Sequence, residues 1–474
     1  MNSEKLKLRQ QKELARLQKE KAKPKRKIYI WYLILILTLI YIVDEVATNS
    51  TSELEDVLMG VLFPGDSANI AASNFSIIST IALIVMILAA FYKPLADRFG
   101  RKPFLVINTL GMALAMGLCS IAVIAHNFII YALGFILLKW FVTPDEQVVY
   151  IFETSPKKWR ATIYSVIKGI AEFGLFLIPF FRSLFISSSP DGVRYIFLTI
   201  AIIAAVAAFL ALLFARESDA FLDERIAYLS LSEEEKERLR QKRIRNKKQQ
   251  GGLIHGLAYC FTHKQLLFIL VATLLYTLAR VVTDKSTAIL AIEGYSTDLI
   301  TAAQFILPIG AGVLTLVYGL FSDKVGRKIT IIVMLALCTI FFGGYVLSFK
   351  LGWNIYVVGL FMGLYLAAYW GTGDTFIMMA GESSPTNLRA SNMSVLSLFY
   401  GMGQVISGVI ASVALRFIGE SNTWLFLLIL ALPCFFGSIF VTMFLVKETK
   451  GIEIETVDKE IDAQLEKERE QISE

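Results

Sequence analysis

Histidine and cysteine are scarce in this chain, which has three histidines and four cysteines among 474 residues. The cysteines lie far apart, without the spacing of a metal site or of a disulfide framework. The histidines all lie at the edges of apolar segments, and no nucleophile, base and orienting residue come together in the pattern. The sequence therefore predicts no metal, no cofactor and no enzyme.

Basic residues are absent from the first polar loop, which contains Glu53, Glu55, Asp56 and Asp66. The preceding segment, residues 4–27, has eleven lysines and arginines and three glutamates. Because basic residues stay on the cytoplasmic side, the N-terminus is predicted to be cytoplasmic. The basic region is too long for a cleaved signal peptide. We interpret it as a solvated tail lying against anionic lipid, rather than as a nucleic-acid-binding segment.

Apolar residues, by contrast, make up 55% of the chain and are arranged in repeated runs of about 20 residues. Runs of this length predict membrane-spanning helices, because a helix satisfies its own backbone hydrogen bonds in lipid. The sequence predicts an all-α membrane protein with twelve spans and both termini in the cytoplasm. The spans are expected near 28–48, 68–92, 104–125, 127–152, 160–182, 193–215, 264–288, 299–321, 329–349, 354–380, 390–416 and 423–446.

The polar segments divide these spans into two groups of six. The predicted domains are a basic tail (1–27), an N-terminal six-helix bundle (28–215), a charged cytoplasmic loop (216–263), a C-terminal six-helix bundle (264–446) and a cytoplasmic tail (447–474). The basic turns between spans all fall on the side assigned to the cytoplasm, so the topology and the charge pattern agree.

The two groups are copies of one unit. In both, an aspartate (Asp145, Asp374) lies eight residues before a glutamate (Glu153, Glu382), and Glu-x-Ser-Pro-x-x-x-Arg-Ala begins at that glutamate. A second matching pair is formed by the charged loops at 93–102 and 318–328, each of which ends in Gly-Arg-Lys. A third match joins the runs at 38–48 and 273–283. Three matches in the same order predict an internal duplication.

These motifs resemble those of the major facilitator superfamily, over residues 28 to 446. The duplicated loop ending in Gly-Arg-Lys is the most specific signature, and the Glu-x-x-Pro-x-x-x-Arg turn resembles the branch of sugar porters and organic-ion transporters. The resemblance implies a twelve-helix transporter whose halves rock in alternating access. The seventh span lacks the glutamine-rich signature of the sugar porters, so a hexose substrate is not implied.

The resemblance also implies a cytoplasmic gate made of charge networks between helix ends. Such pairs can bias a two-state equilibrium because they are partly desolvated in one state and hydrated in the other. Surface charge that only sets the topology is the alternative interpretation. The gate residues are Asp97, Arg101, Glu153, Arg160, Asp323, Arg327, Glu382 and Arg389.

Ionisable residues inside the spans are candidate binding sites for substrate or protons, because a charge in the membrane is costly. Asp145 and Lys168 lie equally far from the turn near Pro156, each about 17 Å along its helix, so we expect them to be level with each other. The alternative is a static network that fixes helix packing. Asp374 is expected to carry a proton. The candidates at this depth are Asp145, Glu146, Lys168, Glu172 and Asp374.

A second group of candidates lies nearer the outer side. Glu45 and Arg280 occupy equivalent positions in the first and seventh spans, so a salt bridge between them is predicted, with Asp44 as a further acid. Lys139 is a further candidate cation, whereas Arg182 and Lys285 are expected to extend to the outer interface. Tyr41 and Tyr276 lie one turn deeper, where their hydroxyls could contact a polar solute or serve only in packing.

Together these features predict a secondary transporter, coupled to protons or sodium, in the cell membrane (plasma or inner membrane). Proton symport of a small polar or anionic organic solute, such as an organic acid, a sugar or a sugar derivative, is favoured. The alternatives are a proton-antiporting exporter of cationic or amphipathic compounds and a non-transporting sensor. The expected partners are the solute, the coupling ion and the bilayer, with the protein as a monomer.

Overall fold

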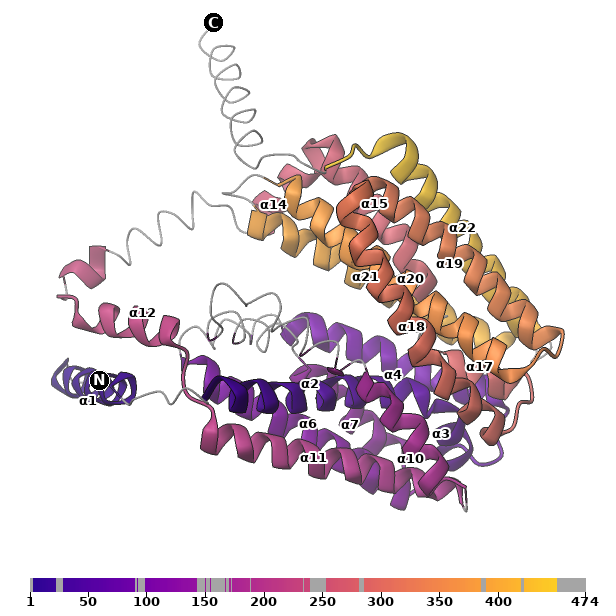
Figure 1. Cartoon of the computed structure of the whole chain (residues 1–474), viewed down its shortest axis with the longest axis horizontal. Coiled ribbons are helices and arrows are strands. Elements are labelled where there is room, and N and C mark those ends of the chain that lie inside the picture. Colours follow the sequence, from indigo (N-terminus) through magenta and orange to yellow (C-terminus); the bar gives the residue numbers. More distant parts are fainter. Residues whose placement is uncertain are drawn as a thin grey trace, which may run out of the picture. The chain divides into compact units, whose positions relative to one another are not determined.

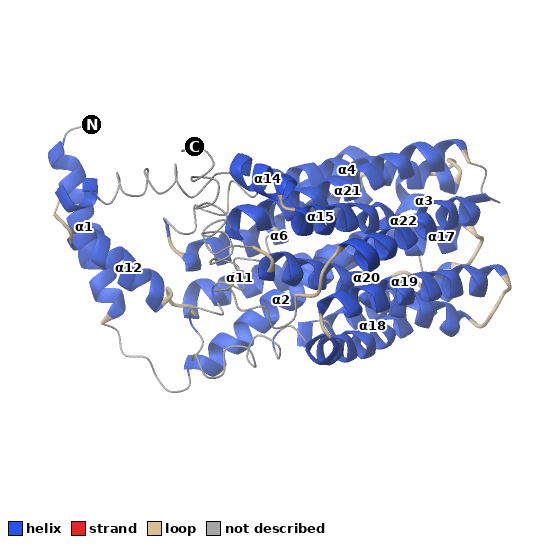
Figure 2. Cartoon of the chain, turned by 90° about the horizontal axis from the view of Figure 1, so that it is seen from above, coloured by secondary structure: helices blue, strands red, loops and turns tan. Residues whose placement is uncertain are grey.

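The protein is described here by a computed structural model. It describes residues 3–22, 29–89, 92, 99–142, 150, 154, 167, 170–171, 173–187, 189–232, 234–238, 253–280, 285–384, 389–418 and 422–449. Figure 2 shows that this part of the chain consists of helices joined by loops, without a strand. The predicted all-α fold is confirmed.

The chain forms two compact units. Unit 1 contains residues 1–65 and 84–244, and unit 2 contains residues 66–83 and 245–474. The helix α4 (Ala68–Ala89) therefore belongs mainly to unit 2 and ends in unit 1. Figure 1 colours the chain in sequence order and labels the helices of both units.

Unit 1 is built around the three long helices α2, α6 and α11. Helix α11 packs against both of the others, and the shorter α7 packs against α6. A small helical pair, α1 and α12, continues from the end of the unit where α2 begins and α11 ends (Figure 1). Its elements are α1 (Ser3–Lys21), α2 (Tyr29–Glu53), α3 (Glu55–Leu62), α6 (Arg101–Ile124), α7 (Phe128–Phe141), η2 (Gly174–Phe176), α10 (Leu177–Phe185), η3 (Pro190–Gly192), α11 (Val193–Phe214) and α12 (Asp219–Ser230).

Unit 2 contains the longest helices, and α20 packs against both α18 and α19 while α15 packs against α21 and α22. Its further elements are α14 (Leu253–Thr262), α15 (Lys264–Thr277), η4 (Leu278–Arg280), α17 (Ser286–Ile292), α18 (Thr297–Val325), α19 (Arg327–Lys350), α20 (Ile355–Glu382), α21 (Arg389–Phe417) and α22 (Thr423–Leu445). Gly359 and Gly363 of α20 lie directly against the backbone of Ala303 and Leu307 in α18, leaving no room for a Cβ atom. This small-residue spacing brings the two helices close together.

Nine helices of the described residues are long and apolar enough to cross a membrane. The bent pair Gly256–Thr262 and Lys264–Arg280 raises the number to ten if it forms one span. The predicted spans at 127–152 and 160–182 are only partly described, and the shorter apolar helices Phe128–Phe141 and Gly174–Phe185 lie within them. The predicted multispanning architecture is therefore confirmed.

The start of α6 and the start of α19 show the duplication directly. Gly100 and Gly326 precede these helices with φ angles of 108° and 110°, a conformation that favours glycine. In both units a glutamate side chain occupies the space that a Cβ atom on this glycine would need: Glu217 in unit 1 and Glu448 in unit 2. The Gly-Arg-Lys sequence is thus a structural feature of both loops.

Candidate functional site

The acidic pair of the first span lies in the second half of α2, where its two members have different surroundings. Asp44 is buried, with 5% of its surface exposed, and its Oδ1 atom accepts no hydrogen bond from the described residues. Its charge interacts with that of Lys139, in the last turn of α7. Glu45 is only partly buried, and its Oε2 atom accepts a hydrogen bond of 3.3 Å from Asn49 Nδ2. Asp44 is thus the buried member of this acidic pair.

Lys139 comes from a helix that is otherwise apolar. Its Nζ atom lies 5.3 Å from the centre of the Phe135 ring, one turn earlier on α7. Lys139 therefore lies over an aromatic face and within electrostatic range of Asp44. Tyr41, one turn before Asp44, is 3% exposed and belongs to an apolar cluster with Leu37 and Ile40. All three residues were candidates from the sequence, which did not predict the proximity of Asp44 to Lys139.

In unit 2 the hydroxyl of the predicted residue Tyr276 lies against α20 at Gly373, which precedes Asp374 in the sequence. Tyr276 is fully buried near the end of α15, and its hydroxyl is close enough to Asp374, on α20, for the two groups to interact electrostatically. Aromatic rings surround it, with ring centres 4.9 Å away for Tyr369, 5.7 Å for Phe376 and 6.1 Å for Tyr400. This aromatic cluster (Tyr276, Tyr369, Phe376 and Tyr400) joins α15, α20 and α21.

The α-helix α15 ends one residue after Tyr276. After Thr277 the chain turns into the 3-10 helix η4, which ends at Arg280. The guanidinium carbon of Arg280 lies 5.4 Å from the centre of the Trp370 ring, which is 44% exposed. Broken helices of this kind form the solute and ion sites of many transporters. The predicted salt bridge with Glu45 joins residues of different units, so it stays a prediction.

Gln404 is a residue that the sequence did not single out. It lies on α21, is 1% exposed, and neither its amide nitrogen nor its amide oxygen has a hydrogen-bond partner among the described residues. Leaving a buried amide unpaired costs free energy. A ligand that forms hydrogen bonds with the amide would remove this cost, so Gln404 is a candidate binding residue. The glutamine between Gly403 and Val405 in an apolar run was the available signal.

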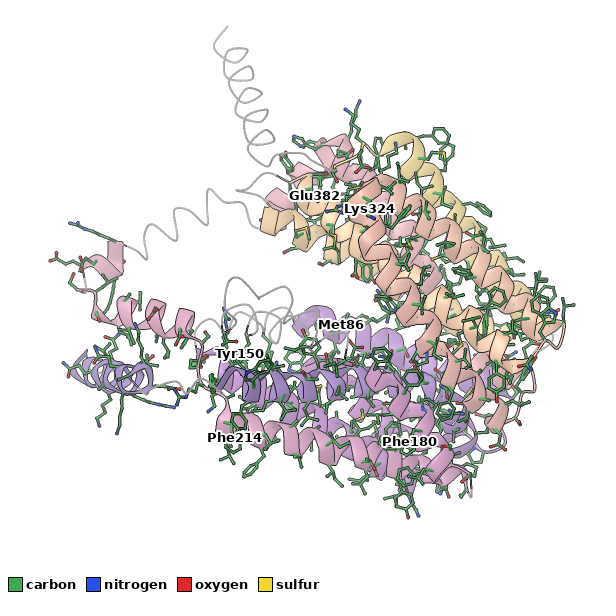
Figure 3. All side chains as sticks on the ribbon, viewed as in Figure 1. Met86, Tyr150, Phe180, Phe214, Lys324 and Glu382 are labelled. Atoms are coloured by element: carbon green, nitrogen blue, oxygen red, sulfur yellow. The ribbon has the colours of Figure 1, made fainter. Side chains whose placement is uncertain are left out.

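Two of the predicted gate residues of unit 2, Arg327 and Glu382, belong to a hydrogen-bonded network at the start of α19, the end of α20 and the residues after α22. Arg327 Nε donates to Glu382 Oε1 at 3.2 Å, and Thr449 Oγ1 donates to Glu382 Oε2 at 2.6 Å. Glu448 accepts backbone hydrogen bonds from Arg327 and Lys328, at 2.8 Å and 3.1 Å. Figure 3 labels Glu382 and, at the same end of this unit, Lys324 of α18.

Unit 1 repeats the same backbone contacts. Glu217 Oε1 accepts from the backbone nitrogen atoms of Arg101 at 2.8 Å and of Lys102 at 3.2 Å. Burial raises the pKa of the Glu217 carboxyl, while backbone hydrogen bonds from Ser218, Arg101 and Lys102 lower it in part. Glu217 and Glu448 were missed at the sequence level. Their signal was a basic residue followed by Glu and then Ser or Thr just after the last span of each half.

Tyr150 lies at this same end of unit 1, and its hydroxyl donates to the carbonyl oxygen of Arg216. Figure 3 shows Tyr150 and Phe214 towards one end of the unit and Phe180 towards the other. The N–H of Arg216 donates to the Tyr29 hydroxyl at 2.9 Å, which ties the start of α2 to the end of α11.

The expectation for Arg182 was wrong. Instead of reaching an outer interface, its side chain is 1% exposed and forms an ion pair with Asp56 inside unit 1. Lys285 is similarly buried, at 4% exposure, with its Nζ atom 5.9 Å from the centre of the Phe75 ring in unit 2. Both side chains are buried in the helix packing, where Asp56 lies beside Arg182 and the Phe75 ring lies near Lys285.

Several candidates lie outside what can be described. The residues Asp97, Asp145, Glu146, Glu153, Arg160, Lys168 and Glu172 are not among the described residues, and only the backbone of Asp323 and Arg389 is described. Within the described part of the chain, no group of three or more His, Cys, Asp or Glu residues could hold a metal ion.

A bundle of apolar helices with two copies of a charged inter-helix loop defines a multi-pass membrane transporter rather than an enzyme. The chain belongs to the family described as "Sugar (and other) transporter", whose sequence model matches residues 32–461. This confirms the resemblance to the major facilitator superfamily and its sugar-porter branch. No curated protein sequence matches the chain significantly.

Solved transporters share the fold. A D-xylose-proton symporter matches with a TM-score of 0.68 and 19% identity, covering 89% of this chain and 99% of its own. The xylose transporter XylE from E. coli, in its inward open conformation, matches with a TM-score of 0.69 and 18% identity over 91% and 99% of the two chains. The nucleoside transporter NupG (D323A mutant) has a TM-score of 0.63 and 14% identity over 88% and 100%.

Proposed function

We propose that the protein is a proton-coupled symporter of a small polar solute of the sugar or sugar-derivative class, with Asp44 as the proton-carrying residue. The observation that carries this proposal is the buried Asp44, which has one oxygen without a hydrogen bond and the charge of Lys139 nearby. An acid inside a span is costly unless it is paired or neutral. Such a residue can alternate between two states, one paired with the lysine and one holding a proton.

The two states have different consequences for unit 1. When Asp44 is ionised it attracts Lys139 and draws α2 and α7 together through their charges. When Asp44 takes up a proton, Lys139 loses this partner, and the attraction between the helices weakens. A proton can therefore shift the balance between two conformations of the transporter, because it binds one of them better.

The polar and aromatic groups of unit 2 are proposed to bind the solute. Gln404 offers an amide with donor and acceptor atoms unused by the described residues. The exposed ring of Trp370 offers an apolar surface, and Tyr276 lies within electrostatic range of Asp374 near the break of the seventh span. An amide and a flat aromatic ring suit the hydroxyls and the C–H faces of a polyol. D-xylose, named for a structural neighbour, is the first probe, followed by a nucleoside and an organic acid.

The test uses the full chain in proteoliposomes, with both exchange and accumulation of labelled solute measured. We expect Asp44→Asn to abolish accumulation driven by a pH gradient, while solute exchange at equal pH continues at a rate within a few-fold of the wild type. Asp66→Asn is the matched control, since it makes the same chemical change at an exposed residue after α3, and it should keep gradient-driven accumulation.

Two results would reject the proposal. If Asp44→Asn accumulates solute as well as the wild type does, Asp44 does not carry the coupling proton. If only cationic compounds exchange, and protons compete with them, the protein is an exporter whose acids bind its substrates.

A further inference from the structure

The N-terminal helix α1 has two separate faces. One face packs against α12: Leu17 joins Leu222 and Leu229 in a buried cluster, with Leu14 and Ile226 packed against it. Ion pairs flank the cluster, since Arg225 Nε lies 2.9 Å from Glu13 Oε1 and Lys21 pairs with Asp223. Figures 1 and 2 both show α1 lying alongside α12. This packing fixes how α1 is turned about its own axis.

The other face of α1 is basic. Lys12, Arg16 and Lys19 are exposed and follow one another at intervals of four and three residues, so they lie on one side of the helix. The sequence continues this register to Arg9 and Lys5, which makes a basic stripe of five residues about 21 Å long. Glu13 and Glu20 follow Arg9 and Arg16 by four residues, so they lie along one edge of this stripe, where both are half-buried. Glu13 is taken up by its ion pair with Arg225.

Both helices of the pair are tied closely to membrane-spanning helices. Only four residues separate the end of α11 at Phe214 from the start of α12 at Asp219. The span of α2 begins at Trp31, and the link between Lys21 and Tyr29 can reach at most about 28 Å. The basic stripe is therefore held near the bilayer surface, on the side where basic residues predominate.

We propose that this basic stripe (Lys5, Arg9, Lys12, Arg16 and Lys19) binds the headgroups of anionic phospholipids at the cytoplasmic surface of the membrane. A straight row of cations fits an extended, negatively charged plane. Leu14 and Leu17 of α1 do not enter the bilayer, because α12 covers them. The binding is thus electrostatic, and α12 takes the place that lipid chains occupy beneath an ordinary amphipathic surface helix.

The end of α1 also lies near the loop that precedes α6. Glu20, near the end of α1, is close enough to Glu217 for their charges to interact, and Glu217 holds the start of α6 through backbone hydrogen bonds. Lipid bound along the stripe would hold the α1–α12 pair in place beside this contact. Lipid binding along the stripe requires neither the transported solute nor the coupling proton.

The experiment compares the full-length protein in nanodiscs of phosphatidylcholine with the same protein in nanodiscs that also contain phosphatidylglycerol. Amide hydrogen exchange of residues 3–21 is the readout. We expect phosphatidylglycerol to slow this exchange by about fivefold or more, because one basic contact with an anionic surface contributes about that factor. Since salt screens exposed charges, 0.5 M NaCl should remove the effect.

Variants separate the stripe from general charge. The triple variant Lys12→Gln/Arg16→Gln/Lys19→Gln should lose the effect of phosphatidylglycerol, whereas Lys12→Arg/Lys19→Arg should keep it. Arg238→Gln/Lys264→Gln/Lys447→Gln removes the same charge at exposed positions elsewhere and should also keep it. These variants change surface residues away from the packed face of α1.

Three outcomes would overturn the proposal. In the first, phosphatidylglycerol leaves the exchange of wild-type α1 unchanged. In the second, the glutamine triple variant on α1 is protected as well as the wild type. In the third, protection is the same in both lipids and disappears when the chain ends at residue 450, which would make the acidic segment 451–474 the partner of the stripe.

Discussion

Arg182 and Asp56 form a bidentate ion pair inside unit 1. Arg182 Nη1 donates to Asp56 Oδ1 at 2.8 Å, and Nη2 donates to Oδ2 at 2.7 Å. Nη1 also donates to the carbonyl oxygen of Glu53, at 2.8 Å, at the end of α2. Through these bonds one side chain of α10 holds both the end of α2 and the start of α3. Both charged side chains are almost fully buried, with 0% and 2% exposure.

Removing the cation should therefore leave a buried carboxylate without its partner. We expect Arg182→Gln to lower the free energy of unfolding by about 3 kcal/mol, because breaking a buried pair costs more than the pair itself contributes. Thermal unfolding of the purified protein in detergent measures this loss. Arg194→Gln, a half-buried arginine near the same end of the unit, should change stability by less than about 0.5 kcal/mol.

A second change separates the ion pair from simple packing. Arg182→Met/Asp56→Leu removes both charges together and should recover a large part of the lost stability. If the double variant is as unstable as Arg182→Gln, the arginine acts through its shape or through the Glu53 carbonyl, and not through the carboxylate of Asp56.

A second prediction compares Gly100, in the loop before α6, with Gly117, within α6. Gly100 has a φ of 108°, and a Cβ atom there would meet the Glu217 carboxylate, whereas a Cβ atom on Gly117 would meet nothing within 4 Å. We expect Gly100→Ala to destabilise the protein by roughly 2 kcal/mol. Gly117→Ala should be neutral or stabilising by up to about 1 kcal/mol, because alanine favours the helix. Equal effects of the two substitutions, measured by thermal unfolding, would contradict this account of the Gly-Arg-Lys loop.

A third prediction concerns pH and Glu217. Because burial raises the pKa of this carboxyl above its ordinary value of 4.5, the folded protein holds the proton more tightly than the unfolded chain does. The contribution of this linkage to stability is therefore complete below pH 4.5 and is lost as the pH rises through the folded-state pKa. Glu217→Gln removes the titrating group. Between pH 4.5 and 8, the melting temperature of the wild type should fall relative to that of Glu217→Gln.

A different pH dependence of the melting temperatures would contradict this prediction. The melting temperatures of the two proteins could instead change in parallel from pH 4.5 to 8, or the wild type could gain stability relative to the variant. Either result would mean that the hydrogen bonds from Arg101 and Lys102 affect the pKa of Glu217 at least as strongly as burial does. A second variant, Glu448→Gln in the equivalent loop, tells whether the behaviour belongs to the repeat or to Glu217 alone.

The helices could be predicted from the sequence because their signal is local. The apolar run expected at 329–349, for example, is the helix Arg327–Lys350, since the length of an apolar run decides whether it can cross a bilayer. The duplication also predicted the matching loops with Gly100 and Gly326. The contacts of Glu217 and Glu448 could have been found by extending the repeat to the residues after each last span.

The side-chain pairs could not be predicted, because they join distant parts of the chain. Asp44 interacts with Lys139, 95 positions later in the sequence, and Arg182 pairs with Asp56, 126 positions earlier. Spacing along a helix predicts which residues share a face, but not which neighbouring helix that face meets. For the same reason the sequence could not indicate that the amide of Gln404 lacks hydrogen bonds with the other described residues.

The last prediction tests Gln404 against a glutamine that has partners. Gln265 of α15 donates from Nε2 to the carbonyl oxygen of Lys447 at 3.0 Å and accepts from the Lys447 N–H at 2.9 Å. Gln404 is buried without such bonds. Because an unpaired buried amide costs about 1–3 kcal/mol, Gln404→Leu should stabilise the solute-free protein, whereas Gln265→Leu should destabilise it. Thermal unfolding in the absence of solute measures both changes.

The same substitution should harm solute binding. A solute that passes the exchange assay is expected to bind Gln404→Leu tenfold or more weakly, since the amide would no longer be present to pair with its hydroxyls. Gradient-driven accumulation at saturating solute should persist, because Asp44 is intact. A stabilised variant with unchanged affinity would mean that Gln404 does not contact the solute. A destabilised variant would mean that the amide has partners in the folded protein, and the unused hydrogen-bonding capacity would then lie elsewhere.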